Sequence, residues 1–438
     1  MSYSKKILSG VSWHLLALSI ALPAGYLNRI LYARYLPKEH VGLFYALWDL
    51  FAMLSIFRTL GVDQAVVHYI PAYLVQNRRK EVSYLVTSGF VLVLAFSLVL
   101  LLLINIFSPY IVKYYLNSKG NFSGQELLVQ KALLVFAWGY FFLIGLAGYL
   151  ANIFQGFQKQ FFVSLLRLFY TLVVLLFSLF FIFSLNLKNF WVPINAYSLS
   201  AFLAVIFYLY FLFRIFTVSF PEEVKISQKF NFTAYFKTEV TKLLRYGLFV
   251  MLTSVGNIIL LYTDGICLTL FSGLKEVADY RNVASPLAMI LTYLTNAIVP
   301  VLFPFISELH YQGNRELLRL TIKKILFWAT LLLFPLACLL SFGAKFIITL
   351  LFPSEYLSAT PALRILAFAA FFSALNSLGF SILNGLGRPN LTSRLIYFGA
   401  VLNLVLNLLL IPKLGMIGAS FATLFSYLAI LLFLFLCF

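Results

Sequence analysis

The sequence has few charged residues and few cysteines. Only 11% of its 438 residues are charged, whereas 62% are apolar. Soluble domains have about a quarter charged and about half apolar residues, so this composition excludes a soluble globular protein. The three cysteines lie far apart in apolar runs and form no Cys-x-x-Cys pair, which excludes a disulfide framework and a cysteine metal site. These cysteines are Cys267, Cys338 and Cys437.

Acidic residues are also scarce, with 14 Asp and Glu against 32 Lys and Arg, for a net charge of +18. On a soluble chain this excess would suggest nucleic acid as a partner. Here the basic residues fall mostly between apolar runs, where membrane topology and anionic lipid account for them. Membrane lipids are therefore expected partners, and nucleic acid is not.

Common catalytic signatures are absent from the sequence. It has no HExxH, GxSxG, P-loop or paired-acid motif. The segments between apolar runs on the predicted outer side are short, which leaves little room for an extramembrane catalytic domain. We expect a protein that is not an enzyme and needs no cofactor.

Long apolar runs dominate what is present. Because about 20 apolar residues cross the hydrocarbon layer as a helix, each run predicts a membrane span. The sequence therefore predicts an all-α polytopic membrane protein with about twelve spans. They are Ile7–Tyr32, Val41–Leu60, Val82–Phe107, Leu127–Ile153, Phe161–Leu185, Trp191–Phe213, Leu243–Phe271, Val277–Ile306, Ile322–Phe342, Pro361–Leu383, Leu391–Ile411 and Met416–Phe438.

The distribution of Lys and Arg predicts the orientation of these spans. With the N-terminus in the cytoplasm, 19 of the 32 basic residues lie in cytoplasmic segments and 11 outside, while Arg29 and Arg58 fall within spans. Cytoplasmic loops are normally the richer in Lys and Arg. We therefore expect a multi-pass protein of the cell membrane with both termini in the cytoplasm.

Two segments of the first half recur in the second half. Asn28–Glu39 aligns with Asp264–Glu276, and Ala151–Lys159 aligns with Ser381–Arg388. Such self-similarity indicates a repeated structural unit. Six spans per unit would leave both units in the same orientation, as in transporters built from parallel repeats.

The longest polar stretch separates the two repeats and predicts the domain organisation. We expect an N-terminal six-helix lobe at 1–216, a cytoplasmic linker at 217–242 and a C-terminal six-helix lobe at 243–438. A central cavity between two parallel-repeat lobes follows from this arrangement.

Several of these segments carry a resemblance to a known family. They are Arg29–Leu36, Pro37–Phe44, Leu60–Ala65 and Leu383–Pro389. Together they resemble polysaccharide transporters of the Wzx type, which share a superfamily with multidrug-extrusion antiporters of the MATE type and with the lipid II flippase. The resemblance implies a MATE-like fold. It also implies translocation of a polyprenyl-(pyro)phosphate-linked oligosaccharide to the outer leaflet by alternating access, as in O-antigen biosynthesis, beside polysaccharide polymerase or glycosyltransferase machinery.

Three arginines are candidates for holding the phosphate of such a substrate: Arg29, Arg58 and Arg281. A guanidinium is permanently charged and its fork of donors matches phosphate oxygens. The alternative for Arg29 is snorkelling to the outer headgroups. The alternative for Arg58 is that it ends its helix near the cytoplasm.

Two aspartates are candidates for ion coupling or for a gate. Asp264 lies in an otherwise uncharged run from Tyr246 to Phe271, and it aligns with Asn28 in the repeat. It could couple transport to H+ or Na+, or it could pair with Arg281 or Arg29 in a closed gate. Asp49 is nine residues before Arg58, so the two side chains leave a regular helix on opposite faces.

Asparagines at membrane depth can bind sugar hydroxyls, although they more often bridge packed helices. The candidates for sugar contacts are Asn28, Asn257 and Asn376. Two other functions stay open for this chain, a cation-coupled multidrug antiporter and a lipid II-type flippase. Arginines at membrane depth weigh against cationic drugs as substrates.

Overall fold

The computed structural model describes residues 3–219, 232–312 and 315–437, with side chains at 16–214, 238–312 and 316–437. Most of the predicted linker at 217–242 lies outside the described side chains. All secondary structure in the described chain is helical, and eleven of its helices are long and apolar enough to cross a membrane. The prediction of an all-α polytopic membrane protein is confirmed.

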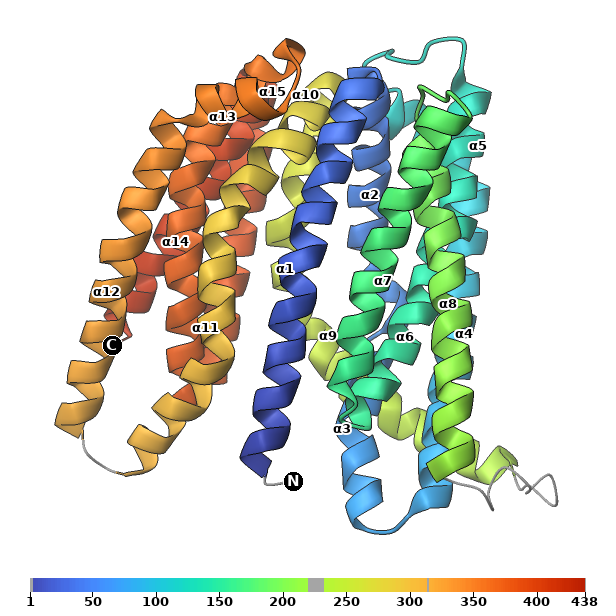
Figure 1. The fold of residues 1–438 in the computed structure, drawn as a ribbon, viewed down its shortest axis with the longest axis vertical. Coiled ribbons are helices and arrows are strands. Elements are labelled where there is room, and N and C mark those ends of the chain that lie inside the picture. The colour runs from blue at the N-terminus through green and yellow to red at the C-terminus, as the bar shows by residue number, and fades with distance from the viewer. Residues whose placement is uncertain (1–2, 220–231, 313–314, 438) are drawn as a thin grey trace. The chain divides into compact units, whose positions relative to one another are not determined.

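The first unit comprises Met1–Tyr35, Phe51–Lys113 and Gly124–Val255. In this unit α7 packs against α1 and α8, and α6 packs against α3, α4 and α8 (Figure 1). The helices are α1 (Tyr3–Tyr35), the end of α2 (Lys38–Thr59), α3 (Val62–Val75), α4 (Arg79–Ile111), α5 (Glu126–Phe136), the π-helix η2 (Ala137–Phe142), α6 (Leu143–Gly156), α7 (Gln160–Leu179), the π-helix η3 (Phe180–Ser184), α8 (Trp191–Ser219) and the beginning of α9 (Phe232–Phe271).

The second unit comprises Leu36–Leu50, Tyr114–Ser123 and Gly256–Phe438. Its centre is α14, which packs against α11, α12 and α15. Besides the rest of α2 and α9, it contains most of the π-helix η1 (Val112–Leu116), α10 (Leu274–Ala278), the π-helix η5 (Asp279–Ala284), α11 (Ser285–Tyr311), α12 (Arg315–Phe342), α13 (Ala344–Leu351), the 3-10 helix η6 (Ser354–Ala359), α14 (Thr360–Gly385) and α15 (Pro389–Leu436).

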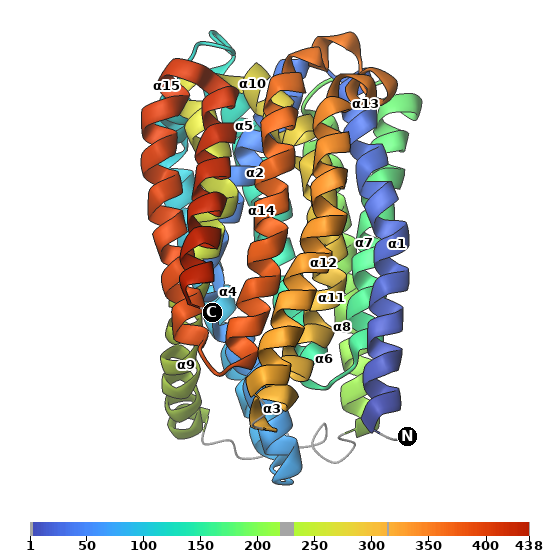
Figure 2. The same ribbon diagram turned by 90° about the vertical axis from the view of Figure 1, so that its left-hand side faces the viewer.

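Helix α15 contains the last two predicted spans. Gly415 interrupts it with φ 56° and ψ −135°, three residues after Pro412, and the chain doubles back there (Figure 2). A positive φ suits glycine because it has no Cβ. The break falls between the predicted spans Leu391–Ile411 and Met416–Phe438, so the eleven helices agree with about twelve crossings.

A second break with positive φ separates α2 from α3, at Leu60 (φ 47°) and Gly61 (φ 74°). Helix α9 packs directly against this break. The backbones are so close that a Cβ on Gly61 would collide with the backbone of Gly247. The glycine pair therefore lets α9 approach α3 at backbone contact distance within the first unit.

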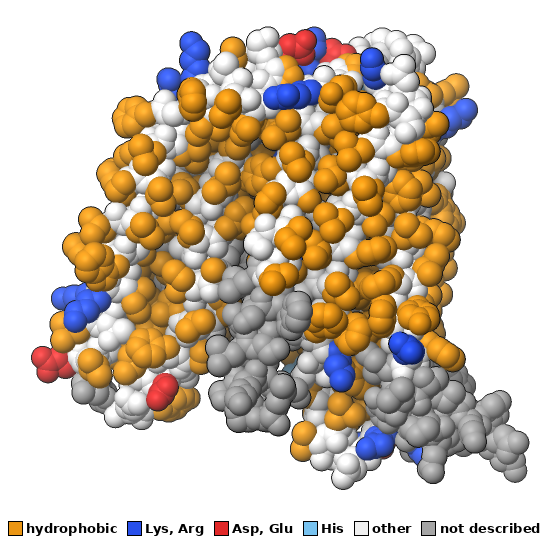
Figure 3. Space-filling model, in the orientation of Figure 1, with side chains coloured by type: hydrophobic (Ala, Val, Ile, Leu, Met, Phe, Trp, Pro, Cys, Tyr) orange, Lys and Arg blue, Asp and Glu red, His pale blue; other side chains and the backbone are white. Residues whose placement is uncertain are grey.

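Large apolar side chains remain exposed along the helices. Examples are Leu102 (60% exposed), Trp328 (63%) and Phe346 (71%). In Figure 3 orange side chains cover the middle stretches of the helices, and blue and red ones gather toward the helix ends. A surface of this kind suits contact with lipid.

Candidate functional site

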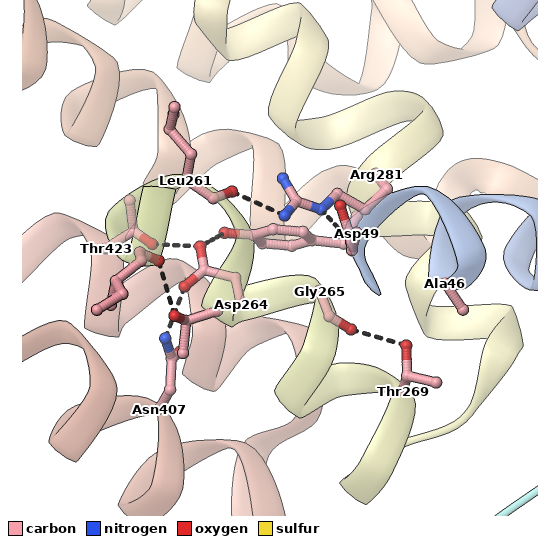
Figure 4. A network of polar contacts seen from close by, with 12 residues as sticks. Ala46, Asp49, Leu261, Asp264, Gly265, Thr269, Arg281, Asn407 and Thr423 are labelled. Atoms are coloured by element: carbon pink, nitrogen blue, oxygen red, sulfur yellow. Dashed lines mark hydrogen bonds and ion pairs between the residues drawn. The ribbon is translucent and has the colours of Figure 1, made fainter. Parts of the chain in front are cut away.

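Asp264 is the centre of a buried polar cluster in the second unit. Its carboxylate is 4% exposed and lies on α9. Oδ2 accepts hydrogen bonds from Tyr280 Oη (2.5 Å) and Thr423 Oγ1 (2.6 Å), while Oδ1 accepts one from Asn407 Nδ2 (2.7 Å; Figure 4). We call these four residues the Asp264 cluster.

Arg281 lies beside this cluster and forms an ion pair with Asp49. Its Nε donates to Asp49 Oδ2 at 2.7 Å, and its Nη2 donates to the backbone oxygen of Leu261 at 2.7 Å (Figure 4). The two charged side chains are 12% and 1% exposed. Because both partners are removed from water, removing either one would leave the other without its direct ionic partner.

Local backbone geometry brings these groups together. Tyr280 and Arg281 are on the π-helix η5, and π-turns inserted in α-helices occur frequently at functional sites. Gly265 follows Asp264 on α9, and a Cβ there would collide with the carboxylate of Asp49 and approach Arg281. A glycine at this position is therefore needed for the ion pair to lie against α9.

A small cavity of about 30 Å³ adjoins the cluster. Its lining combines apolar side chains with Asp264, Arg281 and six hydroxyl-bearing residues. These are Tyr280, Ser285, Thr292, Ser373, Thr423 and Tyr427. A cavity of this size has room for one or two waters or a small cation. Oxygen atoms dominate the side-chain donors, and hard cations prefer oxygen ligands.

The charges of this site do not cancel. Asp49 and Asp264 each carry a carboxylate, and Arg281 supplies one guanidinium, so the site is negative by one when all three are ionised. An unbalanced charge at membrane depth costs at least about 2.5 kcal/mol unless it is compensated. A proton or a monovalent cation would balance it.

The structure separates the predicted roles of the two acidic candidates. Asp264 receives its hydrogen bonds from uncharged donors, and the ion pair of Arg281 is made with Asp49. Asp279, two residues before Arg281, bonds to Lys38 (2.7 Å) and Ser358 (2.8 Å) instead. Asp279 and Arg281 therefore contact different partners.

Arg58 lies in the first unit, packed against the π-helix η2. Its Nη1 donates to the backbone oxygen of Phe141 at 2.5 Å, and the guanidinium lies 4.8 Å from the centre of that ring. Among the described residues, Arg58 Nε is buried without a hydrogen-bond partner. The first unit therefore holds a buried cationic donor that lacks an acceptor.

Arg29 and Asn28 lie on α1 in the same unit. The side chain of Arg29 is half-buried. Asn28 is 3% exposed, and its Oδ1 accepts no hydrogen bond from the described part of the chain. Arg281 belongs to the other unit. The three-arginine phosphate site thus remains a prediction.

The other two asparagine candidates differ in environment. Asn376 is buried and donates from Nδ2 to the backbone oxygen of Tyr427 at 2.9 Å, which joins α14 to α15. That contact is the helix-packing role expected as the alternative to sugar binding. Asn257 is exposed on α9. Sugar contact by either residue stays a prediction.

Three partners of Asp264 are absent from the candidates that the sequence suggests: Tyr280, Asn407 and Thr423. Tyr280 is 16 residues from Asp264, whereas Asn407 and Thr423 are 143 and 159 residues away. A single hydroxyl in an apolar run gives no signal in the sequence. Asn403 and Asn407 were detectable as a pair on one helical face, four residues apart, and Asn407 does donate to Asn403 at 3.0 Å.

The family model described as "Polysaccharide biosynthesis protein" matches residues 7–310. The chain belongs to this family. A second model, MatE, matches residues 250–409. The resemblance to polysaccharide transporters and their superfamily is thereby confirmed.

Two relatives differ in how much of the chain they match. An uncharacterized membrane protein of Methanocaldococcus jannaschii, MJ1068, is 43% identical over 98% of this chain and 83% of its own length. The probable low-salt glycan biosynthesis flippase Agl15 of Haloferax volcanii is 24% identical over 42% of this chain and 39% of its own length. The first match covers nearly the whole chain of this family member, and the second covers less than half.

Two solved structures share the fold. The lipid II flippase MurJ, in an inward closed conformation, has a TM-score of 0.73 at 17% identity, covering 97% of this chain and 87% of its own. An inward-facing multidrug resistance MATE family transporter of the MOP superfamily has the same TM-score at 18% identity, covering 97% and 98%. The predicted MATE-like fold is confirmed.

Proposed function

We propose that this family member is a flippase that moves a polyprenyl-(pyro)phosphate-linked oligosaccharide from the cytoplasmic to the outer leaflet by alternating access. Its product would serve the biosynthesis of a cell-surface polysaccharide or glycan. The family description and the similarity to a probable glycan biosynthesis flippase support this assignment. The cell membrane would be its location, beside polymerase or glycosyltransferase machinery.

The observation that carries the proposal is the buried guanidinium of Arg58, whose Nε has no acceptor among the described residues. Nε faces α6 at Gly145, so a ligand would bind the other N–H donors of the guanidinium. A permanent cation at membrane depth favours an anionic ligand, and its fork of donors matches phosphate oxygens. A cationic drug would instead add positive charge beside a positive group.

The negative site in the second unit supports coupling of transport to a cation. Asp264 and Asp49 exceed Arg281 by one charge, and the adjoining cavity offers oxygen donors. Inward movement of H+ or Na+ to Asp264 would restore neutrality there. With an inside-negative potential, each negative charge moved outward gains about 2.3 kcal/mol per 100 mV, so the potential would contribute in the same direction.

The experiment is leaflet exposure of the lipid-linked glycan in cells that lack the gene and in cells with the gene restored. We expect lipid-linked oligosaccharide to accumulate facing the cytoplasm without the protein. Unchanged lipid-linked pools combined with sensitivity to cationic drugs would contradict the proposal and favour the multidrug antiporter. Accumulation of lipid II alone would favour a lipid II-type flippase.

A further inference from the structure

A pocket of about 930 Å³ lies between α3 and α9 in the first unit, apart from the Asp264 cluster. We call it the α3–α9 pocket. It adjoins the glycine contact at which α9 crosses the beginning of α3. Its lining residues are Tyr69, Thr238, Thr241, Lys242, Arg245, Tyr246, Phe249, Val250 and Thr253.

The residues that α9 contributes recur every three or four positions, which places them on one face of the helix. From Thr238 to Thr253 this face extends about 22 Å at 1.5 Å per residue. It begins with hydroxyl and cationic side chains at Thr238–Arg245, continues with Phe249 and Val250, and ends at Thr253. This change from polar to apolar along one face matches an amphiphile with a charged head and a hydrocarbon tail.

The ammonium of Lys242 is held in place within the pocket. It donates to Tyr73 Oη at 2.5 Å, and Tyr73 donates to the carboxylate of Glu239 at 2.8 Å. The ammonium also lies 4.2 Å from the centre of the Tyr69 ring. An ammonium carries three N–H donors, so Lys242 can hold Tyr73 and a ligand oxygen at the same time.

Tyr73 acts as a neutral donor in this chain of contacts. It lies on α3, outside the candidate spans. Burial and the hydrogen bond to Glu239 raise the pKa of the Tyr73 phenol. The proton therefore stays on Tyr73 at physiological pH, and the phenol oxygen remains available to accept from Lys242.

Aromatic rings form the remaining wall beside the cations. Tyr69 and Tyr246 meet edge to face at 5.5 Å, and His68 stacks on Tyr246 at 4.6 Å. Exposed Arg245 precedes Tyr246 directly on α9. Flat rings beside Lys242 and Arg245 suit a sugar joined to a phosphate, because a ring offers an apolar face and the cations take the phosphate oxygens.

We propose that the α3–α9 pocket binds the sugar-phosphate head of an isoprenoid-linked substrate at the end of the first unit that is predicted to face the cytoplasm, with the lipid tail beside Phe249 and Val250. This inference rests on the proposed function and names a loading site for it. The pocket volume lies in the range that encloses a whole small-molecule ligand, well beyond a single phosphate group.

The test is native mass spectrometry of the purified full chain in detergent. The probes are geranylgeranyl diphosphate N-acetylglucosamine, geranylgeranyl diphosphate and phosphatidylglycerol. We expect the wild type to bind both diphosphate probes more tightly than phosphatidylglycerol. The variant Lys242→Gln/Arg245→Gln should weaken binding of both diphosphate probes at least tenfold. Tyr246→Leu should weaken binding of the sugar-bearing probe alone.

The matched control is Lys323→Gln/Lys324→Gln, which removes two exposed lysines from α12 of the second unit. It should bind all probes as the wild type does. Equal binding of the diphosphate probes by Lys242→Gln/Arg245→Gln and the wild type would overturn the inference. The inference would also be overturned if the wild type bound phosphatidylglycerol as tightly as the diphosphate probes and the same variant lost that binding. The pocket would then be a site for membrane phospholipid.

Transport in proteoliposomes separates this inference from the proposed function. We expect Lys242→Gln/Arg245→Gln to slow transport of the lipid-linked glycan at low substrate and to approach the wild-type rate at saturation. Absence of transport by the wild type, with pocket binding intact, would contradict the flippase function alone. A variant with unchanged rates at all substrate concentrations would contradict the loading site alone.

Discussion

Arg281 donates through Nε to Oδ2 of Asp49 at 2.7 Å, although the two residues are 232 positions apart in the chain. The neighbouring carboxylate of Asp264 is held by uncharged donors. One acidic group is thus paired with a permanent cation, while the other has uncharged donors only and, in the proposed coupling, would exchange a proton or a metal ion. This division between a structural and an exchangeable carboxylate motivates the first two predictions.

Breaking the ion pair should destabilise the protein. Asp49→Asn removes the carboxylate that accepts from Arg281 Nε, and loss of one partner of a buried pair costs about 3–5 kcal/mol. The double variant Asp49→Asn/Arg281→Gln should recover part of this loss because neither side chain of the pair then carries a charge. Thermal unfolding of the purified full chain measures both.

The control for these two variants is Lys275→Gln, which breaks an exposed ion pair with Glu39 in the same unit. Exposed pairs contribute at most about 1 kcal/mol, so its unfolding midpoint should stay close to that of the wild type. If Asp49→Asn lowers the unfolding midpoint as little as this control does, Arg281 has found another partner.

Asp264→Asn should make transport insensitive to the coupling gradient. An amide cannot release a proton and it binds a cation without a compensating charge. Initial rates in proteoliposomes with imposed H+ or Na+ gradients measure the effect, and Thr423→Ser, which keeps the hydroxyl donor, serves as the matched control. If protonophore and sodium removal act on Asp264→Asn as on the wild type, Asp264 has a structural role.

Gly265→Ala should disturb the ion pair of Asp49 with Arg281 and lower the stability of the protein, because the new Cβ would collide with the carboxylate of Asp49. Gly148→Ala on α6 is the control, since a Cβ there meets nothing within 4 Å. Replacing glycine by alanine inside a helix otherwise gains about 0.5–1 kcal/mol. The two variants should therefore shift the unfolding midpoint in opposite directions, and a shared direction would contradict the packing of Asp49 on α9.

Arg58→Ala and Arg29→Ala should each abolish complementation of a flippase-deficient strain at unchanged protein levels. Loss of a permanent cation would remove a phosphate contact. Arg58→Lys should restore only part of the activity, because an ammonium lacks the planar fork of donors. Full glycan export by both alanine variants would refute a phosphate-binding role for these arginines.

The membrane spans could be predicted from the sequence because crossing the hydrocarbon layer requires a long apolar run, and such runs are local. The break at Gly415 was equally accessible, since Pro412 and Gly415 interrupt the last apolar stretch. Asp264 stood out because it is the sole charge in the run from Tyr246 to Phe271.

The partners of Asp264 could not be predicted because tertiary packing selects them. Many threonines and asparagines lie in apolar runs, and only the packing of α15 against its neighbours brings Thr423 and Asn407 to this carboxylate. The pairing of Asp49 with Arg281 likewise depends on a glycine, Gly265, that has no sequence signature of its own. The α3–α9 pocket was missed for a similar reason, since it needs backbone contact at Gly61 and Gly247.

The bend at Gly415 has a consequence for motion within the second unit. Glu276 on α10 accepts the backbone N–H of Met416 at 2.7 Å, so a carboxylate caps the N-terminus of the last helical segment. Two turns further along, Thr423 donates to Asp264. Two acidic side chains twelve positions apart thus fix the axial register of this segment, which can neither slide nor rotate by a turn without breaking both hydrogen bonds.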